Sequence, residues 1–122
     1  MKVLFVEDDA MNRRVVRDML SVIGLHMAEA DNAELGLRMI DEGQFDLVLM
    51  DLRMPGMDGL TAIKHVRDRE DQKGKVPIIV VTADTSADLR EQCAGLGAND
   101  FLQKPVAMND LFESIAKVVT LV

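Results

Sequence analysis

The side chains best suited to chemistry stand where short apolar runs of the sequence end. The clearest case is Asp51, which closes the apolar run Leu47 to Met50 and precedes a Pro-Gly loop. Groups of this kind follow four apolar runs, and they are Glu7 with Asp8, Asp51, Thr82 and Lys104. Apolar runs of this length are typical of strands buried in a parallel sheet, whose carboxyl ends lie at one edge. The sequence therefore predicts that residues far apart along the chain meet in one site.

Several carboxylates in one site favour a bound cation. Two carboxylates about 5 Å apart repel by about 3 kcal/mol at an effective dielectric of 20, so Glu7, Asp8 and Asp51 need a positive ion nearby. Mg2+ fits because it prefers one or two carboxylates, keeps several waters and takes further ligands from phosphate oxygens. Beside a phosphate, Lys104 can neutralise one oxygen and the Thr82 hydroxyl can donate a hydrogen bond to another. Asp51 is then left as a nucleophile that would form an aspartyl phosphate.

Each of these residues also has a purely structural explanation. The acids after the first run could cap a helix, and Asp51 could simply begin a turn. Thr82 could form a turn through its hydroxyl, and Lys104 could be a solvated surface lysine. Taken together, these explanations do not account for the placement of all the groups at strand ends.

Apolar runs alternate with helical patterns along the chain. The expected strands are Lys2 to Val6, His26 to Ala30, Phe45 to Met50, Ile78 to Thr82 and Asp100 to Gln103. The expected helices begin near Ala10, after Asp31 or Asn32, after Asp58, near Ser86 and near Asn109. Alternating strands and helices imply right-handed crossovers and a parallel sheet. We therefore expect an α/β fold made of strand-helix units, written (βα)5.

The composition fits one folded domain. Of 122 residues, 48% are hydrophobic and 29% are charged, the balance of a globular protein. No apolar stretch approaches the roughly 20 residues of a membrane span, and no secretory signal is expected. The net charge of −7 argues against nucleic-acid binding, which needs a basic face. The single Cys93 cannot form an intramolecular disulfide, so a cytoplasmic location is expected.

Short motifs at the strand ends carry a resemblance to a known family. They are Val6-Glu7-Asp8-Asp9, the segment Leu49 to Gly59, Val81-Thr82-Ala83 and Lys104-Pro105. In their order and spacing the chain closely resembles the receiver domain of two-component response regulators. The resemblance implies a flavodoxin-like (βα)5 receiver fold over residues 1–122, a five-stranded parallel sheet of order 2-1-3-4-5 with helices on both faces. It also implies phosphoryl transfer from a phosphohistidine on a partner to Asp51.

The resemblance further implies roles for individual residues. The Mg2+ ligands would be Glu7, Asp8, Asp51 and the backbone carbonyl of Arg53. Thr82 and Lys104 would bind the phosphoryl group. On phosphorylation the Thr82 hydroxyl would move inward and Phe101 would turn in behind it, although Phe101 could equally be a plain core residue.

Partner contacts follow from the same resemblance. A histidine kinase or a histidine phosphotransfer protein would dock on Met11, Pro105 and Val106, with core packing as the alternative for these residues. Output is expected through contacts with a downstream protein target or through onward phosphotransfer, with neither nucleic acid nor membrane as a partner. Arg53 and Asp84 carry opposite charges near the site, so we expect a pair that impedes the water which hydrolyses the acyl phosphate.

Other functions remain open at this point. A haloacid-dehalogenase-like phosphatase also uses Asp, Mg2+, Thr or Ser, and Lys, but it carries the nucleophile after its first strand. A nucleotide or flavin carrier would share the fold, but the glycine-rich phosphate motifs do not occur. The expected function is a phosphorylated signalling switch that catalyses only its own phosphorylation and dephosphorylation. It would be either free-standing or part of a hybrid histidine kinase or of a longer regulator. The segment Glu7 to Asn12, with its Asn12, resembles receivers in phosphorelays and hybrid kinases.

Overall fold

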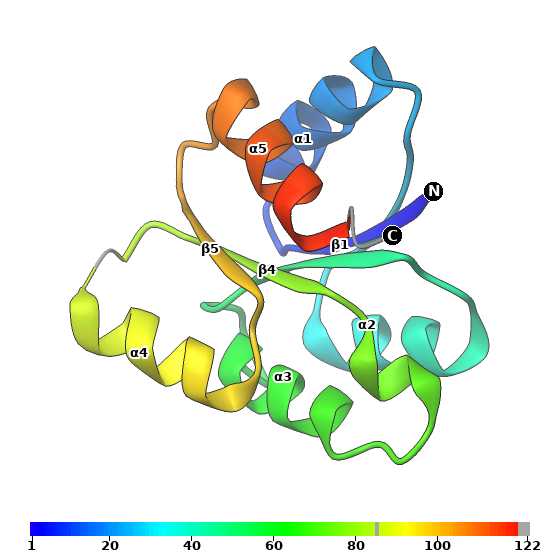
Figure 1. The fold of residues 1–122 in the computed structure, drawn as a ribbon, viewed down its shortest axis with the longest axis vertical. Coiled ribbons are helices and arrows are strands. Elements are labelled where there is room, and N and C mark those ends of the chain that lie inside the picture. The colour runs from blue at the N-terminus through cyan, green and yellow to red at the C-terminus, as the bar shows by residue number, and fades with distance from the viewer. Residues whose placement is uncertain (85, 120–122) are drawn as a thin grey trace.

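A five-stranded parallel sheet forms the centre of the molecule, with strand order β2-β1-β3-β4-β5 (Figure 1). The structure is a computed structural model and describes residues 1–84 and 86–119. Its strands are β1 (Lys2–Val6), β2 (His26–Ala30), β3 (Leu47–Asp51), β4 (Ile78–Thr82) and β5 (Asp100–Gln103). Its helices are α1 (Ala10–Val22), α2 (Ala33–Glu42), α3 (Gly59–Arg67), η1 (Gln72–Lys75), α4 (Ala87–Leu96) and α5 (Met108–Val119). The predicted fold class and strand order are confirmed.

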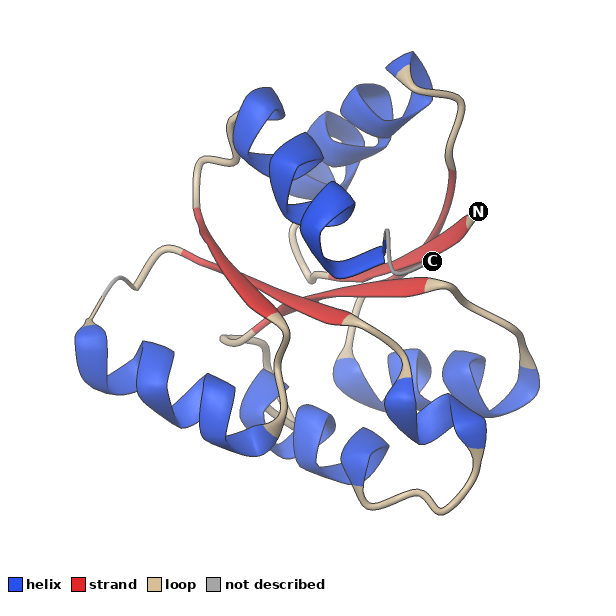
Figure 2. Cartoon of the chain, in the orientation of Figure 1, coloured by secondary structure: helices blue, strands red, loops and turns tan. Residues whose placement is uncertain are grey.

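Helices cover both faces of the sheet (Figure 2). One face packs against α1 and α5 through residues such as Leu20 and Leu111. The other packs against α2, α3 and α4 through residues such as Ile40, Ile63 and Cys93. All residues of β3 and β4 are buried, which is why these strands read as unbroken apolar runs. The site at the strand ends therefore stands on a rigid, dry core.

Side-chain caps fix where most of the helices begin. Asp9, Asn32, Asp58 and Ser86 each accept a hydrogen bond from a backbone N–H in the first turn of the helix that follows. The choice between Asp31 and Asn32 is thus settled for Asn32. Each cap satisfies a donor that the helix itself cannot pair, so each of these helices begins at the residue after its cap.

The third strand differs from its expected range. We expected Phe45 to Met50, but β3 begins at Leu47 and includes Asp51, which pairs with Val81 of β4. Asp46 lies before the strand because its carboxylate accepts from the backbone N–H of Lys2, while the Lys2 ammonium lies 5.3 Å from the Phe45 ring. The backbone of Asp51 is consequently held by the sheet itself.

The charged stretch after α3 also differs from expectation. Instead of simply fraying, the chain forms the short helix η1. Arg67 holds this region by donating hydrogen bonds to the carbonyls of Gly74 and Gly97, the residue that ends α4 with a φ of 105°. None of the described helices is both long and apolar enough to span a bilayer.

Candidate functional site

The ends of β1, β3, β4 and β5 bring the predicted site residues together. The Lys104 ammonium lies 2.5 Å from Glu7 Oε1 and 3.3 Å from Asp51 Oδ1. The backbone N–H of Lys104 donates to the Thr82 carbonyl at 2.8 Å, so the lysine is anchored beside β4. Glu7, Asp51 and Thr82 are all buried, with 0%, 4% and 1% of their surface exposed. The convergence expected from the strand ends is present in the structure.

Close approach of the backbone at the end of β3 depends on a glycine. A Cβ on Gly59 would lie 2.3 Å from the Asp51 carbonyl oxygen and 2.7 Å from the Leu52 Cα. The backbone N–H of Gly59 donates to the Leu52 carbonyl at 2.9 Å. Glycine therefore lets the start of α3 pack directly against the strand end that carries Asp51.

The carboxylates of Glu7, Asp8 and Asp51 form one cluster, because an oxygen from each lies within 4.8 Å of the others. Burial raises the pKa of Glu7, and the nearby Asp51 adds to the rise while Lys104 opposes it. Burial also raises the pKa of Asp8, with a further contribution from Glu7. The protein thus gathers negative charge at a place where the charged forms are costly.

A divalent cation fits this cluster. Glu7 Oε2 is buried and has no hydrogen-bond partner among residues 1–84 and 86–119. An unpaired buried carboxylate oxygen is expensive unless a donor or a metal satisfies it. The ligand atoms that the cluster offers are all carboxylate oxygens, which suits the hard ion Mg2+. Glu7, Asp8 and Asp51 are the residues that would hold it.

Lys104 partly balances the cluster by itself. Burial disfavours its ammonium, but the hydrogen bond to Glu7 and the attraction of Asp51 outweigh burial and raise its pKa. Lys104 therefore stays charged beside Asp51. A cation in this position suits a phosphoryl oxygen on Asp51 as well as the bare carboxylate.

The Thr82 hydroxyl accepts a hydrogen bond from the backbone N–H of Asp84 at 3.2 Å. The turn considered as the structural explanation for Thr82 is therefore present. This turn uses the hydroxyl only as an acceptor, so the hydroxyl proton remains available for another acceptor.

Arg53 and Asp84 form the expected pair. Arg53 Nη2 lies 2.7 Å from Asp84 Oδ2, and 77% of the Arg53 side chain is exposed. Both residues line an open groove of about 600 Å³, together with Met54, Pro55 and Leu89. Hydrogen bonds from the backbone N–H and hydroxyl of Ser86 lower the pKa of Asp84, and Arg53 adds to the effect. The pair links the loop after β3 to the loop after β4.

The remaining predicted residues lie around the site. Phe101 is half-buried in β5 with the Arg90 guanidinium 5.6 Å from its ring centre. Met11 is 68% exposed and is not a core residue. Pro105 is exposed, whereas Val106 is half-buried against the core beneath α1 and α5. The core-packing alternative is thus wrong for Met11 and partly right for Val106.

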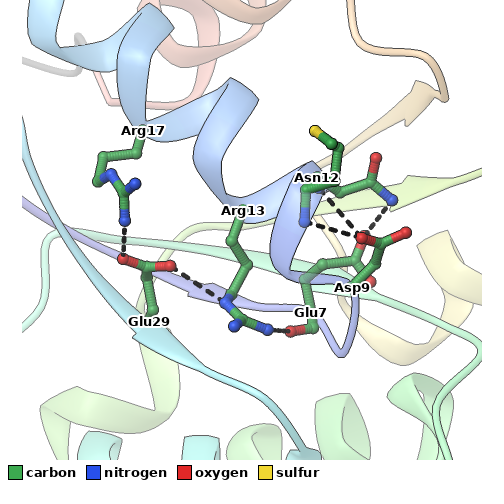
Figure 3. Close-up of polar contacts among 7 residues, drawn as sticks. Glu7, Asp9, Asn12, Arg13, Arg17 and Glu29 are labelled. Carbon is green, nitrogen blue, oxygen red and sulfur yellow. Dashed lines mark hydrogen bonds and ion pairs between the residues drawn. The ribbon is translucent and has the colours of Figure 1, made fainter.

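Sequence reasoning missed several contacts that hold the site. Figure 3 shows Asn12 and Arg13 of α1 reaching back to Glu7. Asn12 Nδ2 donates to Glu7 Oε1 at 3.1 Å, and Arg13 Nη1 donates to the Glu7 carbonyl at 2.7 Å. Glu34 of α2 accepts from the backbone N–H of Met57 at 3.3 Å and so braces the loop after β3. The one available signal was the position of Asn12 three residues after the helix cap Asp9, where a side chain faces back toward the strand end.

Comparison with known proteins identifies the family. The sequence model of the response regulator receiver domain matches residues 3–116. The chain is 34% identical over 119 residues to chemotaxis protein CheY-3 of Vibrio cholerae, covering 97% of this chain and 91% of that protein. It is also 34% identical over 113 residues to hybrid signal transduction histidine kinase G of Dictyostelium discoideum, covering 91% of this chain but only 3% of that protein.

A solved structure gives the same assignment. The receiver domain of a sensor histidine kinase from Pseudomonas aeruginosa, solved with a magnesium ion coordinated in its active-site cleft, is 31% identical. The two structures superpose with a TM-score of 0.88 over 98% of this chain and 97% of that one. With its sheet order, its acidic cluster and these matches, the chain belongs to the response regulator receiver domain family.

Proposed function

We propose that this protein is a phosphoacceptor receiver that takes a phosphoryl group from a partner phosphohistidine onto Asp51, with Mg2+ as its cofactor. The observation that carries the proposal is Glu7 Oε2, which has no hydrogen-bond partner among the described residues and lies in a carboxylate cluster beside Lys104. Glu7, Asp8, Asp51 and the backbone carbonyl of Arg53 would hold the ion. When bound, Mg2+ would neutralise charge that develops on the phosphoryl oxygens.

The protein's own groups would carry the transfer. An Asp51 carboxylate oxygen attacks phosphorus, a new P–O bond forms, and the P–N bond to the partner histidine breaks with its electrons returning to the imidazole. The Lys104 ammonium lies 3.3 Å from Asp51 Oδ1 and would then contact a phosphoryl oxygen. The Thr82 hydroxyl would donate a hydrogen bond to another phosphoryl oxygen. Phe101 would move together with Thr82, and this movement would be the switch. The whole chain, residues 1–122, would act as one such domain, of which the structure describes all but residues 85 and 120–122.

Phosphorylation by a small donor tests this proposal. Acetyl phosphate with Mg2+ should add one phosphoryl group to the wild type, seen by intact mass spectrometry, and none to Asp51→Asn or to the wild type with a chelator. A wild type that never gains a phosphoryl group would overturn the proposal. The same samples separate a receiver from a phosphatase, since a receiver should not turn over general phosphomonoesters.

The proposed partners are a histidine kinase or a histidine phosphotransfer protein and a downstream protein, with the chain in the cytoplasm. Pro105 and Val106 line a small pocket of about 100 Å³ together with Asn12, Val15 and Lys104, and the exposed Met11 directly precedes Asn12 in α1. This apolar rim next to the site suits a partner that must bring its histidine to Asp51.

A substitution in the rim tests the docking surface separately from the chemistry. Met11→Asp should impair phosphoryl transfer from a phosphorylated histidine protein but leave labelling by acetyl phosphate intact. Val22→Asp is the matched control, because Val22 is equally exposed, at 68%, at the far end of the same helix. Equal transfer to Met11→Asp and Val22→Asp would rule out Met11 as a docking residue.

A further inference from the structure

Glu7 is held at both ends by consecutive residues of α1 (Figure 3). The side-chain amide of Asn12 donates to the carboxylate, and the guanidinium of Arg13 donates to the main-chain carbonyl. The start of α1 makes this possible, because Asp9 accepts from the backbone N–H groups of Met11 and Asn12 and sets the first turn. Asn12 therefore faces the end of β1 as a consequence of the helix cap.

The two oxygens of Glu7 are used differently. Oε1 takes both available donors, Asn12 Nδ2 at 3.1 Å and the Lys104 ammonium at 2.5 Å. Oε2 takes none from the part of the chain that the structure describes. Because a donor on Oε1 fixes the rotation of the carboxylate plane, the same contact determines which oxygen remains for a ligand.

Lys104 cannot provide this orientation at every stage. If the proposed function is correct, Lys104 shifts toward a phosphoryl oxygen once Asp51 is phosphorylated, and its contact with Glu7 weakens. Asn12 is neutral and lies on a capped helix, so its contact does not depend on the charge of Asp51. It is then the remaining donor, among the described residues, that orients Glu7.

We propose that Asn12 is a positioning residue for the metal site: it holds Glu7 Oε1 and thereby keeps Glu7 Oε2 directed at Mg2+. This inference rests on the proposed function. Removal of a group that orients a metal ligand typically weakens metal binding by 10- to 100-fold. Because Glu7 is only one of several ligands, and because Lys104 also contacts Oε1 before phosphorylation, we expect a loss of about tenfold in Mg2+ affinity, near the lower end of that range.

The network around Arg13 separates this role from folding. Arg13 Nε pairs with Glu29 of β2 at 3.1 Å, and Arg17 Nη1 pairs with the other oxygen of Glu29 at 2.7 Å. These contacts hold the main chain of Glu7 without Asn12. Loss of the Asn12 amide should therefore leave the backbone of the site in place.

Titration of Mg2+ into isotope-labelled protein, followed through backbone amide NMR signals, tests the proposal. Asn12→Ala and the size-matched Asn12→Leu should each bind Mg2+ about tenfold more weakly than the wild type. Asn109→Ala, at an exposed position in the first turn of α5, is the matched control and should bind like the wild type. Two variants are used so that a folding failure in one leaves the other informative.

A double-mutant cycle shows whether Asn12 acts through Glu7. In a Glu7→Gln background, loss of Asn12 should weaken Mg2+ binding less than about twofold, since coupled residues are non-additive. An undiminished tenfold loss in that background would overturn the inference, as would unchanged Mg2+ affinity in the single variants.

A metal-free readout completes the test. The Asn12 side-chain amide signals of the metal-free protein should shift on Glu7→Gln, and a lack of shift would contradict the contact. If the wild type itself binds no Mg2+, the proposed function fails rather than the contact between Asn12 and Glu7.

Discussion

The two sides of the site differ in burial. One side is built on β1, and the other is built on the loops after β3 and β4. On the first side, Glu7 is fully buried and takes donors from Asn12, Arg13 and Lys104. On the second side, the ion pair between Arg53 and Asp84 spans the groove, and 77% of the Arg53 side chain is exposed. Buried charges respond strongly to the loss of a partner, whereas exposed pairs contribute little to stability. We infer that the buried side governs Mg2+ binding. The exposed side would govern how readily water reaches the proposed acyl phosphate on Asp51.

Removal of the Lys104 charge should have the largest effect. Lys104→Met leaves Glu7 and Asp51 buried without their cation, and breaking such a pair typically costs 3–5 kcal/mol. Because 18% of the Lys104 side chain is exposed, we expect a smaller loss of about 2 kcal/mol in the free energy of unfolding, measured in urea without Mg2+. Lys117→Met, which removes an exposed lysine paired with Asp100, is the control and should change stability far less. Equal losses in the two variants would erase the distinction between a buried and an exposed lysine.

Neutralising Glu7 should raise the stability of the metal-free protein and weaken its stabilisation by Mg2+. Burial raises the pKa of Glu7, so the folded state disfavours its charged form. At neutral pH and without metal, Glu7→Gln should therefore be more stable than the wild type, and the difference should vanish below about pH 4, where Glu7 is protonated in both states. Added Mg2+ should stabilise the wild type more than the variant. Thermal unfolding with and without Mg2+ measures both effects, and a less stable metal-free variant would contradict the account.

The network behind Glu7 should respond at an intermediate level. Glu29→Gln removes the charge that joins Arg13 and Arg17, and 29% of the Glu29 side chain is exposed. We expect a loss of about 1 kcal/mol in the free energy of unfolding. Asp68→Asn breaks the pair with Lys64, in which both side chains are about two-thirds exposed, and should cost less. If Asp68→Asn proves the more destabilising, burial is the wrong basis for the comparison.

The exposed pair should affect lifetime and leave stability nearly unchanged. Arg53→Ala and Asp84→Ala should each hydrolyse the acyl phosphate several-fold faster, because the pair no longer impedes water at the mouth of the site. Phosphate release from the phosphorylated protein measures the rate, and urea unfolding measures stability in parallel. Unchanged hydrolysis in both variants would show that the pair does not gate the site.

The strand ends of the site were predictable because sheet topology depends on apolar runs that the sequence displays directly. Asp51, Thr82 and Lys104 follow such runs, and opposite charges near the site sufficed to predict the pair of Arg53 and Asp84. The start of β3 was misplaced because Phe45 is apolar yet packs outside the ladder, where Asp46 binds the backbone of Lys2.

Apart from the position of Asn12 after the helix cap Asp9, the supporting contacts left no signal in the sequence. The bond from Asn12 to Glu7 depends on side-chain rotamers at a strand-to-helix turn, which no periodicity encodes. Arg13 of α1 meets Glu29 of β2, and Glu34 of α2 meets Met57 in the loop after β3, at separations that carry no sequence signal. The sequence thus displays the side chains at the strand ends more clearly than the side chains that contact them.

The most direct test of the central claim is the NMR response of the protein to beryllofluoride, a mimic of the phosphoryl group, in the presence of Mg2+. The account predicts large shifts of the backbone amides of Asp51, Thr82 and Lys104, and smaller shifts at Asn12 and Asp84 on the two sides of the site. Asp51→Asn should show none of them. Shifts that persist in Asp51→Asn, or a wild type whose site amides do not respond, would contradict the assignment of Asp51 as the phosphoacceptor.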